Sequence, residues 1–196
     1  GRNNRWGTFP SVNGMWRMGQ ESFIRDNTHW LNDVKIRAGY GVLGNDGIGQ
    51  FLYTRSFSGD QIKYSFDGKE VTGWANFKVP NEDIKWEEVH QLDLGVDFSL
   101  FNNRLSLTYD FYDRQTLDML YWRKMPFASG IGNYWNGQPS MPVNVGKVQN
   151  IGHELTINWM DRVADFNYSV GFNASWNSNK ILDLGVAGAE PIMDGI

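Results

Sequence analysis

Charged side chains fall on alternate positions in several segments of this sequence, where they would share one face of an extended strand. Four carboxylates have this spacing: Asp93, Asp97, Asp110 and Glu154. In neighbouring strands they could face one another, and paired carboxylates can carry out general acid and base catalysis. Two cations on alternate positions of an earlier segment, Lys35 and Arg37, would lie on the same side. Because opposite charges on one face neutralise each other, we interpret the set as charge balance rather than as a catalytic site.

Aromatic side chains collect in two stretches that lack regular alternation. They are Trp74 and Phe77 in the first stretch, and Trp122, Phe127, Tyr134 and Trp135 in the second. Large, flat, amphipathic rings suit contacts with sugar rings or peptide side chains, and they are also enriched at buried protein interfaces. We therefore expect these residues to contact either a ligand or a covering protein.

Other residues capable of chemistry lack the neighbours that such chemistry needs. The histidines have no partners at metal-ligand spacing: His29, His90 and His153. The sequence contains no Cys, which excludes disulfides and zinc-thiolate sites. A GxGxxG pattern at residues 39–44 would need to lead from a strand into a helix to bind a dinucleotide, and turn-forming residues follow it instead. We predict no metal, no cofactor and no enzymatic activity.

Long alternating segments position the charged residues. From Val34 to Val42 the even positions are apolar or aromatic and the odd positions are Lys, Arg or Gly, and the alternation repeats from Leu92 to Leu100. Since side chains of an extended strand alternate sides, each segment has one apolar and one hydrophilic face. A tilted strand of roughly 9 to 11 residues crosses the hydrocarbon layer of a bilayer. The pattern therefore predicts strands that separate lipid from water.

The spacing predicts six such strands, at residues 11–18, 33–42, 90–100, 104–113, 146–160 and 166–176. The turns at 101–103 and 161–165 are short, whereas the connections 43–86, 114–144 and 178–196 are long. Bacterial outer-membrane barrels have short periplasmic turns and longer extracellular loops. We therefore assign the long connections to the extracellular side and residues 19–32, with one short helix, to the periplasmic side. The predicted fold class is all-β, part of a transmembrane antiparallel β-barrel.

Composition is compatible with this interpretation. The mean hydropathy is −0.47, as expected where only every second strand residue is apolar, and 9 Trp and 22 Gly stand among 196 residues. The net charge of −4 and the scattered basic residues argue against a nucleic-acid partner. Six strands cannot close a barrel, because the smallest have about eight. The sequence opens on Gly1 without an initiator Met or signal peptide, so we expect an internal fragment of a longer barrel.

Several phrases resemble the SusC-like TonB-dependent transporters of Bacteroidetes. The most extensive is WLNDVKIRAGYGVLGN at residues 30–45, and others are FPSV at 9–12, NEDIKWE at 81–87 and NVGKVQNIGHE at 144–154. The resemblance covers nearly the whole chain in order. It departs from the family pattern at three positions that a barrel tolerates, where the family often has Ser, Thr and Pro: Ala38, Leu43 and Glu82.

The resemblance implies the C-terminal half of an outer-membrane barrel of about 22 strands with a plugged lumen. It places the plug domain and the TonB-box segment, which takes energy from the inner membrane, outside this sequence. It also implies a SusD-like surface lipoprotein over the barrel, an oligosaccharide or peptide as the nutrient, and plug contact for the charged inner face.

Two alternatives remain. One is a soluble β-sandwich that acts as a carbohydrate-binding module, although sandwiches usually have turn signals every 8 to 12 residues. The other is a passive porin, which would share the wall but would not need the family phrases.

Overall fold

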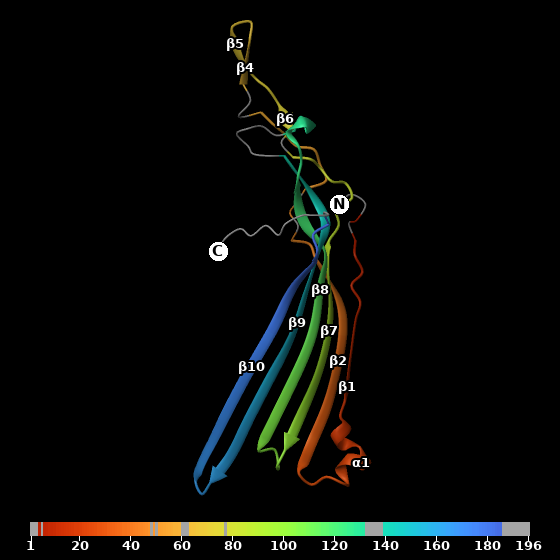
Figure 1. Cartoon of the computed structure of the whole chain (residues 1–196), viewed down its shortest axis with the longest axis vertical. Coiled ribbons are helices and arrows are strands. Elements are labelled where there is room, and N and C mark those ends of the chain that lie inside the picture. The colour runs from red at the N-terminus through yellow and green to blue at the C-terminus, as the bar shows by residue number, and fades with distance from the viewer. Residues whose placement is uncertain are drawn as a thin grey trace.

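A computed structural model describes residues 4, 6–47, 49, 51–59, 63–76, 78–131 and 139–185. Over these residues, six long strands form one antiparallel sheet in the order β1-β2-β7-β8-β9-β10 (Figure 1). The strands are β1 (Ser11–Trp16), β2 (Leu31–Asn45), β7 (Glu87–Leu100), β8 (Leu105–Lys124), β9 (Ser140–Val163) and β10 (Phe166–Asp183). The described part of the chain is therefore all-β apart from short helical turns, as the alternation predicts.

Short elements fill the connections. A 3-10 turn η1 (Met18–Gln20) and a one-turn helix α1 (Ser22–Arg25) lie between β1 and β2, and a second 3-10 turn η2 (Phe127–Ser129) follows β8. Two small two-stranded sheets lie between β2 and β7. They pair β3 (Phe57–Ser58) with β6 (Ala75–Asn76), and β4 (Lys63–Phe66) with β5 (Lys69–Thr72). No helix among the described residues is long and apolar enough to cross a membrane.

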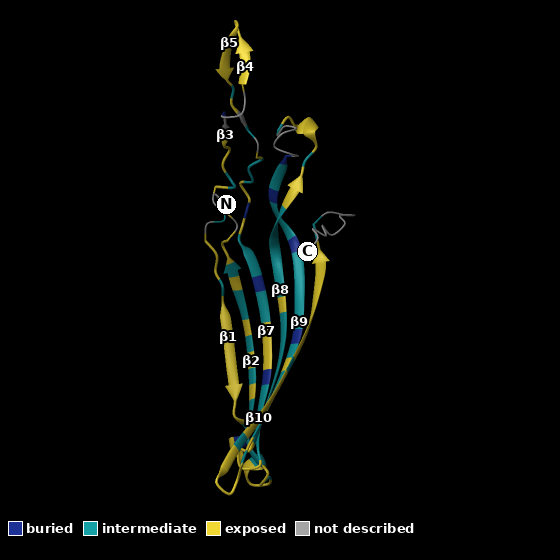
Figure 2. Ribbon diagram, turned by 90° about the vertical axis from the view of Figure 1, so that its left-hand side faces the viewer, coloured by how far each residue is buried: buried dark blue, intermediate teal, exposed yellow. Residues whose placement is uncertain are grey.

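The large sheet is a single layer without a conventional hydrophobic core (Figure 2). The only buried hydrophobic side chains among the described residues are Val34, Ile84 and Val89. Large apolar side chains along the strands remain exposed, for example Leu94 at 43% and Phe172 at 57%. A sandwich would bury one face of this sheet against a second sheet about 10 Å away. The described residues form no such second layer, so the soluble β-sandwich receives no support.

Alternation along the strands separates the two faces of the sheet. One face, here called the apolar face, carries the exposed side chains of Ile36, Leu94, Val170, Phe172 and Trp176. The opposite, polar face carries Lys35 and Arg37 of β2, Asp93 and Asp97 of β7, and Asp110 of β8. Cross-strand register keeps the two sets apart along the middle of the sheet, where Ile36 lies opposite Val96 and Lys35 lies opposite Asp97.

The two short turns close hairpins at one end of the sheet. Phe101, Asn102 and Asn103 all have positive φ, at 54°, 59° and 63°, and connect β7 to β8. Asn tolerates this left-handed conformation better than most residues. The β9–β10 turn is tighter than the predicted 161–165, because strand pairing continues to Val163 and resumes at Phe166, with Ala164 at φ 54°.

The predicted connection 114–144 is wrong over much of its length. Residues 114–124 belong to β8 and residues 140–144 belong to β9, and the two strands stay paired as far as Lys124 and Ser140. A bulge between Thr116 and Met119 interrupts the register, with Asp118 at φ 56°. A bulge changes which side chains face which way, so the sequence alternation stops although the hydrogen-bonded ladder continues.

The other strand bounds also differ from the predictions. β2 extends to Asn45, β7 begins at Glu87, and β10 continues to Asp183 into the predicted loop 178–196, whereas β1 already ends at Trp16. In the added part of β10, Ser178, Asn179 and Lys180 are polar at consecutive positions. Alternation signals a strand only where one face is apolar, so these positions carry no such signal.

Candidate functional site

The polar face centres on Arg37 of β2. Its Nε and Nη2 donate to the two carboxylate oxygens of Asp97 on β7, at 2.9 and 3.1 Å. The same Nη2 also donates to Oδ1 of Asp110 on β8, at 2.8 Å. Thr108 adds a hydroxyl donor to Asp97 at 3.1 Å. One guanidinium therefore joins three adjacent strands through charge-assisted hydrogen bonds, which are stronger than neutral ones.

Gly95 makes this connection possible. It lies between Arg37 and Asp110 in the cross-strand register, on the strand that the guanidinium crosses. A Cβ at position 95 would stand 2.6 Å from Arg37 Cζ and 2.6 Å from Asp110 Oδ1. Real side chains do not approach so closely, so any residue larger than Gly would displace the guanidinium from Asp110.

The next cross-strand row repeats the arrangement with a tyrosine. Tyr112 of β8 is opposite Gly152 of β9, and a Cβ at position 152 would meet the Tyr112 ring at 2.2 Å. The ring therefore lies flat across β9, in the space that the glycine leaves free. Both rows use a glycine so that a long side chain can lie across the neighbouring strand.

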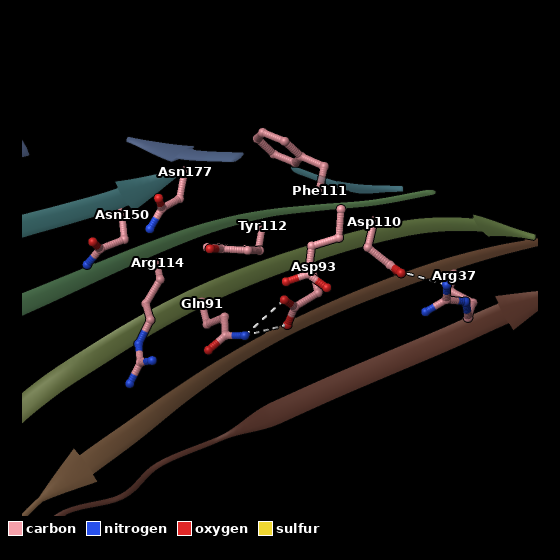
Figure 3. Close-up of a pocket in the computed structure, with 10 residues that line it drawn as sticks. Arg37, Gln91, Asp93, Asp110, Phe111, Tyr112, Arg114, Asn150 and Asn177 are labelled. Atoms are coloured by element: carbon pink, nitrogen blue, oxygen red, sulfur yellow. Dashed lines mark hydrogen bonds and ion pairs between the residues drawn. The ribbon is translucent and has the colours of Figure 1, made fainter. Parts of the chain in front are cut away.

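A polar hollow of about 660 Å³ lies over these rows (Figure 3). Its lining includes both cations and carboxylates, namely Arg37, Arg114, Asp93, Asp110 and Glu154. Figure 3 shows these strands side by side, with Phe111 pointing away from the labelled polar groups. The mixture of charges suits contact with a polar protein surface or a hydrated solute.

The structure brings together only part of the predicted charged set. Arg37, Asp97 and Asp110 are in direct contact. Glu154 lies opposite Asp110 in the register, and Lys35 lies opposite Asp97, without a hydrogen bond to it. Asp93 accepts two hydrogen bonds from Gln91, at 2.9 and 3.1 Å, and belongs to the same hollow.

The chemistry of the polar face is structural. Both carboxylates nearest Arg37 are engaged by its guanidinium, so neither is placed as a free general acid or base. Within the described ranges, no group of three or more His, Asp or Glu side chains could hold a metal ion.

The predicted aromatic contacts lie on separate elements. Trp74 follows β5 and is 71% exposed, Trp122 is on β8, and Phe127 begins η2. Phe77, Tyr134 and Trp135 lie outside the described residues. Trp122 borders a small pocket with residues from the β2–β7 connection.

Residues 81–87 are fastened across the β8–β9 hairpin. The Asn144 side chain accepts from the Lys85 N–H at 2.9 Å and donates to the carbonyls of Lys85 and Asp118, both at 2.9 Å. The Lys85 ammonium also pairs with Asp118 at 2.6 Å, and Ile84 is buried beneath. We call these contacts of residues 81–87 with Asn144 and Asp118 the clasp. It fixes the end of the β2–β7 connection to the neighbouring hairpin.

Comparison with known proteins identifies the family of this chain. The family described as "TonB dependent receptor-like, beta-barrel" matches residues 1–192. The chain belongs to this family. TonB-dependent receptors are β-barrel proteins of the bacterial outer membrane, and the wall of such a barrel has one apolar and one polar face, as this sheet does.

Named relatives agree with this assignment. The chain is 37% identical over 184 residues to TonB-dependent receptor P3 of Formosa agariphila and 35% identical over 187 residues to TonB-dependent receptor SusC of Bacteroides thetaiotaomicron. Each alignment covers 93% of this chain but only 17% and 18% of the relative. The chain therefore spans less than a fifth of the length of these TonB-dependent receptors.

Solved structures of this family have the same fold. A structure of the RagAB peptide transporter aligns with a TM-score of 0.76 at 31% identity, over 95% of this chain and 19% of that chain. The RagAB peptide importer in the open-open state aligns with a TM-score of 0.77 at 32% identity, over 92% and 18%. These relatives are named as receptors and transporters, not as enzymes.

Sequence reasoning missed several residues of the TonB-dependent receptor's polar face. Gln91, Tyr112, Asn150 and Asn177 line the hollow; the first three share the parity of the predicted charged residues on their strands, and Asn177 lies one residue beyond the predicted strand 166–176. Arg114 was assigned to a loop, because the predicted strand ended one residue earlier. No local signal identifies the clasp, since Asn144 acts on a segment far away in sequence.

Proposed function

We propose that this chain is the barrel segment of an outer-membrane, TonB-dependent importer of a large nutrient, either an oligosaccharide or a peptide. The observation that supports this most directly is the single-layer sheet, whose exposed apolar face is backed by a charged, hydrogen-bonded polar face. Such a wall suits lipid on one side and a water- or protein-filled lumen on the other. The matched RagAB structures are described as a peptide transporter and importer.

In this proposal the wall itself is passive. Its lumen-facing residues Lys35, Arg37, Asp93, Asp97, Asp110 and Glu154 contact a plug domain supplied by another part of the receptor. Because Arg37 fixes three strands together, this part of the wall stays rigid while the plug moves. Energy comes from TonB, through the N-terminal part of the receptor.

The partners are a SusD-like surface lipoprotein, outer-membrane lipid and the nutrient, with no nucleic acid. Trp74, Trp122 and Phe127, and the predicted Phe77, Tyr134 and Trp135, contact the nutrient or the lipoprotein on the extracellular side. Their support is the exposure of the first three: Trp74 and Phe127 lie on connections, and Trp122 lies near the end of β8, which is the end of the sheet opposite the short turns (Figure 1).

The test is nutrient uptake by cells that carry the complete receptor. Cells with and without the receptor gene are given labelled oligosaccharides and labelled peptides, each with and without a protonophore. We expect one nutrient class to enter only when the receptor is present, and entry to stop when the protonophore removes the energy source. The receptor should also be recovered from the outer-membrane fraction.

Two results would overturn the proposal. Uptake that needs the gene but continues at the same rate with the protonophore would identify a passive porin. Recovery of the complete protein in the soluble fraction without detergent would contradict the membrane assignment altogether.

A further inference from the structure

A small pocket lies between the β2–β7 connection and the β8–β9 hairpin, at the end of the sheet opposite the short turns. Its volume is about 140 Å³. One side consists of Phe51 and Leu52 with Val79 and Pro80, all from the β2–β7 connection. The other side consists of Trp122 and Pro142, which are register partners in the β8–β9 hairpin. Neither the β2–β7 connection nor the β8–β9 hairpin forms this pocket alone.

The pocket is built by internal hydrogen bonds. Phe51 has φ 60°, a left-handed conformation that is a genuine outlier for a bulky residue. Its carbonyl accepts from both the N–H and the hydroxyl of Thr54, at 3.1 and 2.8 Å. Residues held in such sparsely populated conformations cluster at ligand sites, where the surrounding structure maintains them.

Asn81 fastens the two sides of the pocket to each other. Its N–H donates to the Leu52 carbonyl at 3.0 Å, and its side-chain amide donates to the Pro142 carbonyl at 2.8 Å. The clasp at Lys85, four residues further along the chain, holds the same connection against β8 and β9. The two walls are therefore fixed before any ligand arrives, which lowers the ordering cost of binding.

The lining selects among ligand classes. Six of its nine lining residues have apolar or aromatic side chains, and the polar side chains are Thr54, Ser56 and Lys78. The Thr54 hydroxyl is already used within the loop. The lining contains no carboxylate and no side-chain amide, so most hydroxyls of an entering sugar would lose water without gaining a partner. An apolar group has no such cost.

The volume of the pocket and its one charged lining residue restrict the class of ligand further. An apolar cavity of about 150 Å³ accommodates benzene, so this pocket has room for one leucine or phenylalanine side chain. Lys78 is the only charged residue in its lining. A cation beside an apolar pocket matches an apolar residue that carries a carboxylate, as at the C-terminus of a peptide.

We propose that this pocket binds the apolar C-terminal residue of a peptide, with its side chain against Trp122 and its carboxylate near Lys78. The proposal rests on the importer function above and selects peptide over oligosaccharide as the nutrient class. It assigns Trp122 to ligand contact rather than to the surface lipoprotein.

The test uses calorimetry on the complete receptor in detergent with three peptides. They are Ala-Ala-Ala-Leu, Ala-Ala-Ala-Ala and the C-terminal amide of the first. We expect the leucine peptide to bind about tenfold more tightly than the alanine peptide, from the apolar surface it buries. The amide should bind about threefold more weakly than the free acid, as suits a partly exposed ion pair.

Three variants and one control test whether the peptide preferences arise in this pocket. Ser56→Phe fills the pocket from its rim and should abolish the leucine preference, as should Trp122→Ala. Lys78→Gln should abolish only the difference between acid and amide. Phe66→Ala, an exposed residue of β4 that does not line the pocket, should change neither. Because Ser56 and Lys78 are exposed, their variants should retain the heat-modifiable electrophoretic mobility of a folded barrel.

The outcomes separate this proposal from the importer function. Equal binding of the leucine and alanine peptides, or a leucine preference that survives Ser56→Phe, would overturn the pocket assignment while energised uptake still stands. A leucine preference that Ser56→Phe removes would support the pocket even if the receptor failed the protonophore test.

Discussion

The guanidinium of Arg37 reaches across strand β7 and donates to Asp110 on β8 at 2.8 Å. The strand that it crosses contributes Gly95 at the crossing point, where a Cβ would stand 2.6 Å from both groups. The polar face is thus joined across three strands by a contact that depends on the absence of a side chain. This dependence gives the first prediction.

Gly95→Ala should lower the free energy of unfolding of the complete barrel by about 1 to 3 kcal/mol, because the added methyl overpacks the site and displaces Arg37. The measurement is urea unfolding in lipid vesicles. Gly39→Ala is the matched control, since its Cβ would be 3.8 Å from the nearest atom, an ordinary contact. Equal losses at the two positions would mean that the crossing has no special role.

Arg37 and Asp97 should show a strong pairwise coupling. A double-mutant cycle with Arg37→Met and Asp97→Asn should give about 1 to 2 kcal/mol, because the pair is bidentate and only partly exposed. The comparison pair is Lys63 and Glu70 of the β4–β5 hairpin, which is as short at 2.7 Å but more than half exposed on both sides. Its coupling should be below about 0.5 kcal/mol. A larger coupling in the exposed pair would contradict this interpretation.

The same substitution should destabilise the barrel by very different amounts at two adjacent residues of β7. Leu94→Arg places a cation on the lipid-facing side and should cost about 2 to 4 kcal/mol near the bilayer midplane. Asp93→Arg places the same side chain in the polar hollow and should cost far less. The measurement is the folded fraction after refolding into vesicles. If Asp93→Arg is the more damaging variant, the two faces have been assigned the wrong way round.

The clasp should depend on the donor groups of Asn144. Asn144→Asp keeps the acceptor for Lys85 N–H but loses both donated bonds and sets a carboxylate against two carbonyls, so it should be at least as disruptive as Asn144→Ala. Hydrogen exchange at residues 81–87 should become about tenfold faster or more in both variants, for a local loss of roughly 1.4 kcal/mol.

Asn179→Ala is the control for the clasp. Asn179 donates one exposed hydrogen bond to Asn150 and holds no distant segment, so exchange at residues 81–87 should be unchanged. Unaltered exchange in Asn144→Asp would show that the hydrogen bonds of Asn144 do not hold the segment.

Sequence alternation predicted the transmembrane strands well where lipid meets one face. Leu92 to Leu100 alternates throughout, and β7 covers it. Prediction failed where consecutive residues are polar, as at residues 177–180 of β10, and where the bulge at Asp118 shifts the alternation within β8. The ligand contacts of Trp74, Trp122 and Phe127 stay predictions, because an exposed aromatic residue has the same sequence signature whether it contacts a nutrient or a protein.

The sequence by itself determined which side chains share a face, because the pleat of an extended strand alternates them whatever the neighbouring strand is. It also carried the family phrases. Only the tertiary structure decided that Arg37 meets Asp97 and Asp110 over Gly95, that Asn144 holds Lys85, and that Phe51 and Trp122 share a pocket. These contacts depend on the register between strands and on the course of long connections. Hydrogen bonds between distant segments set both, and no local pattern records them.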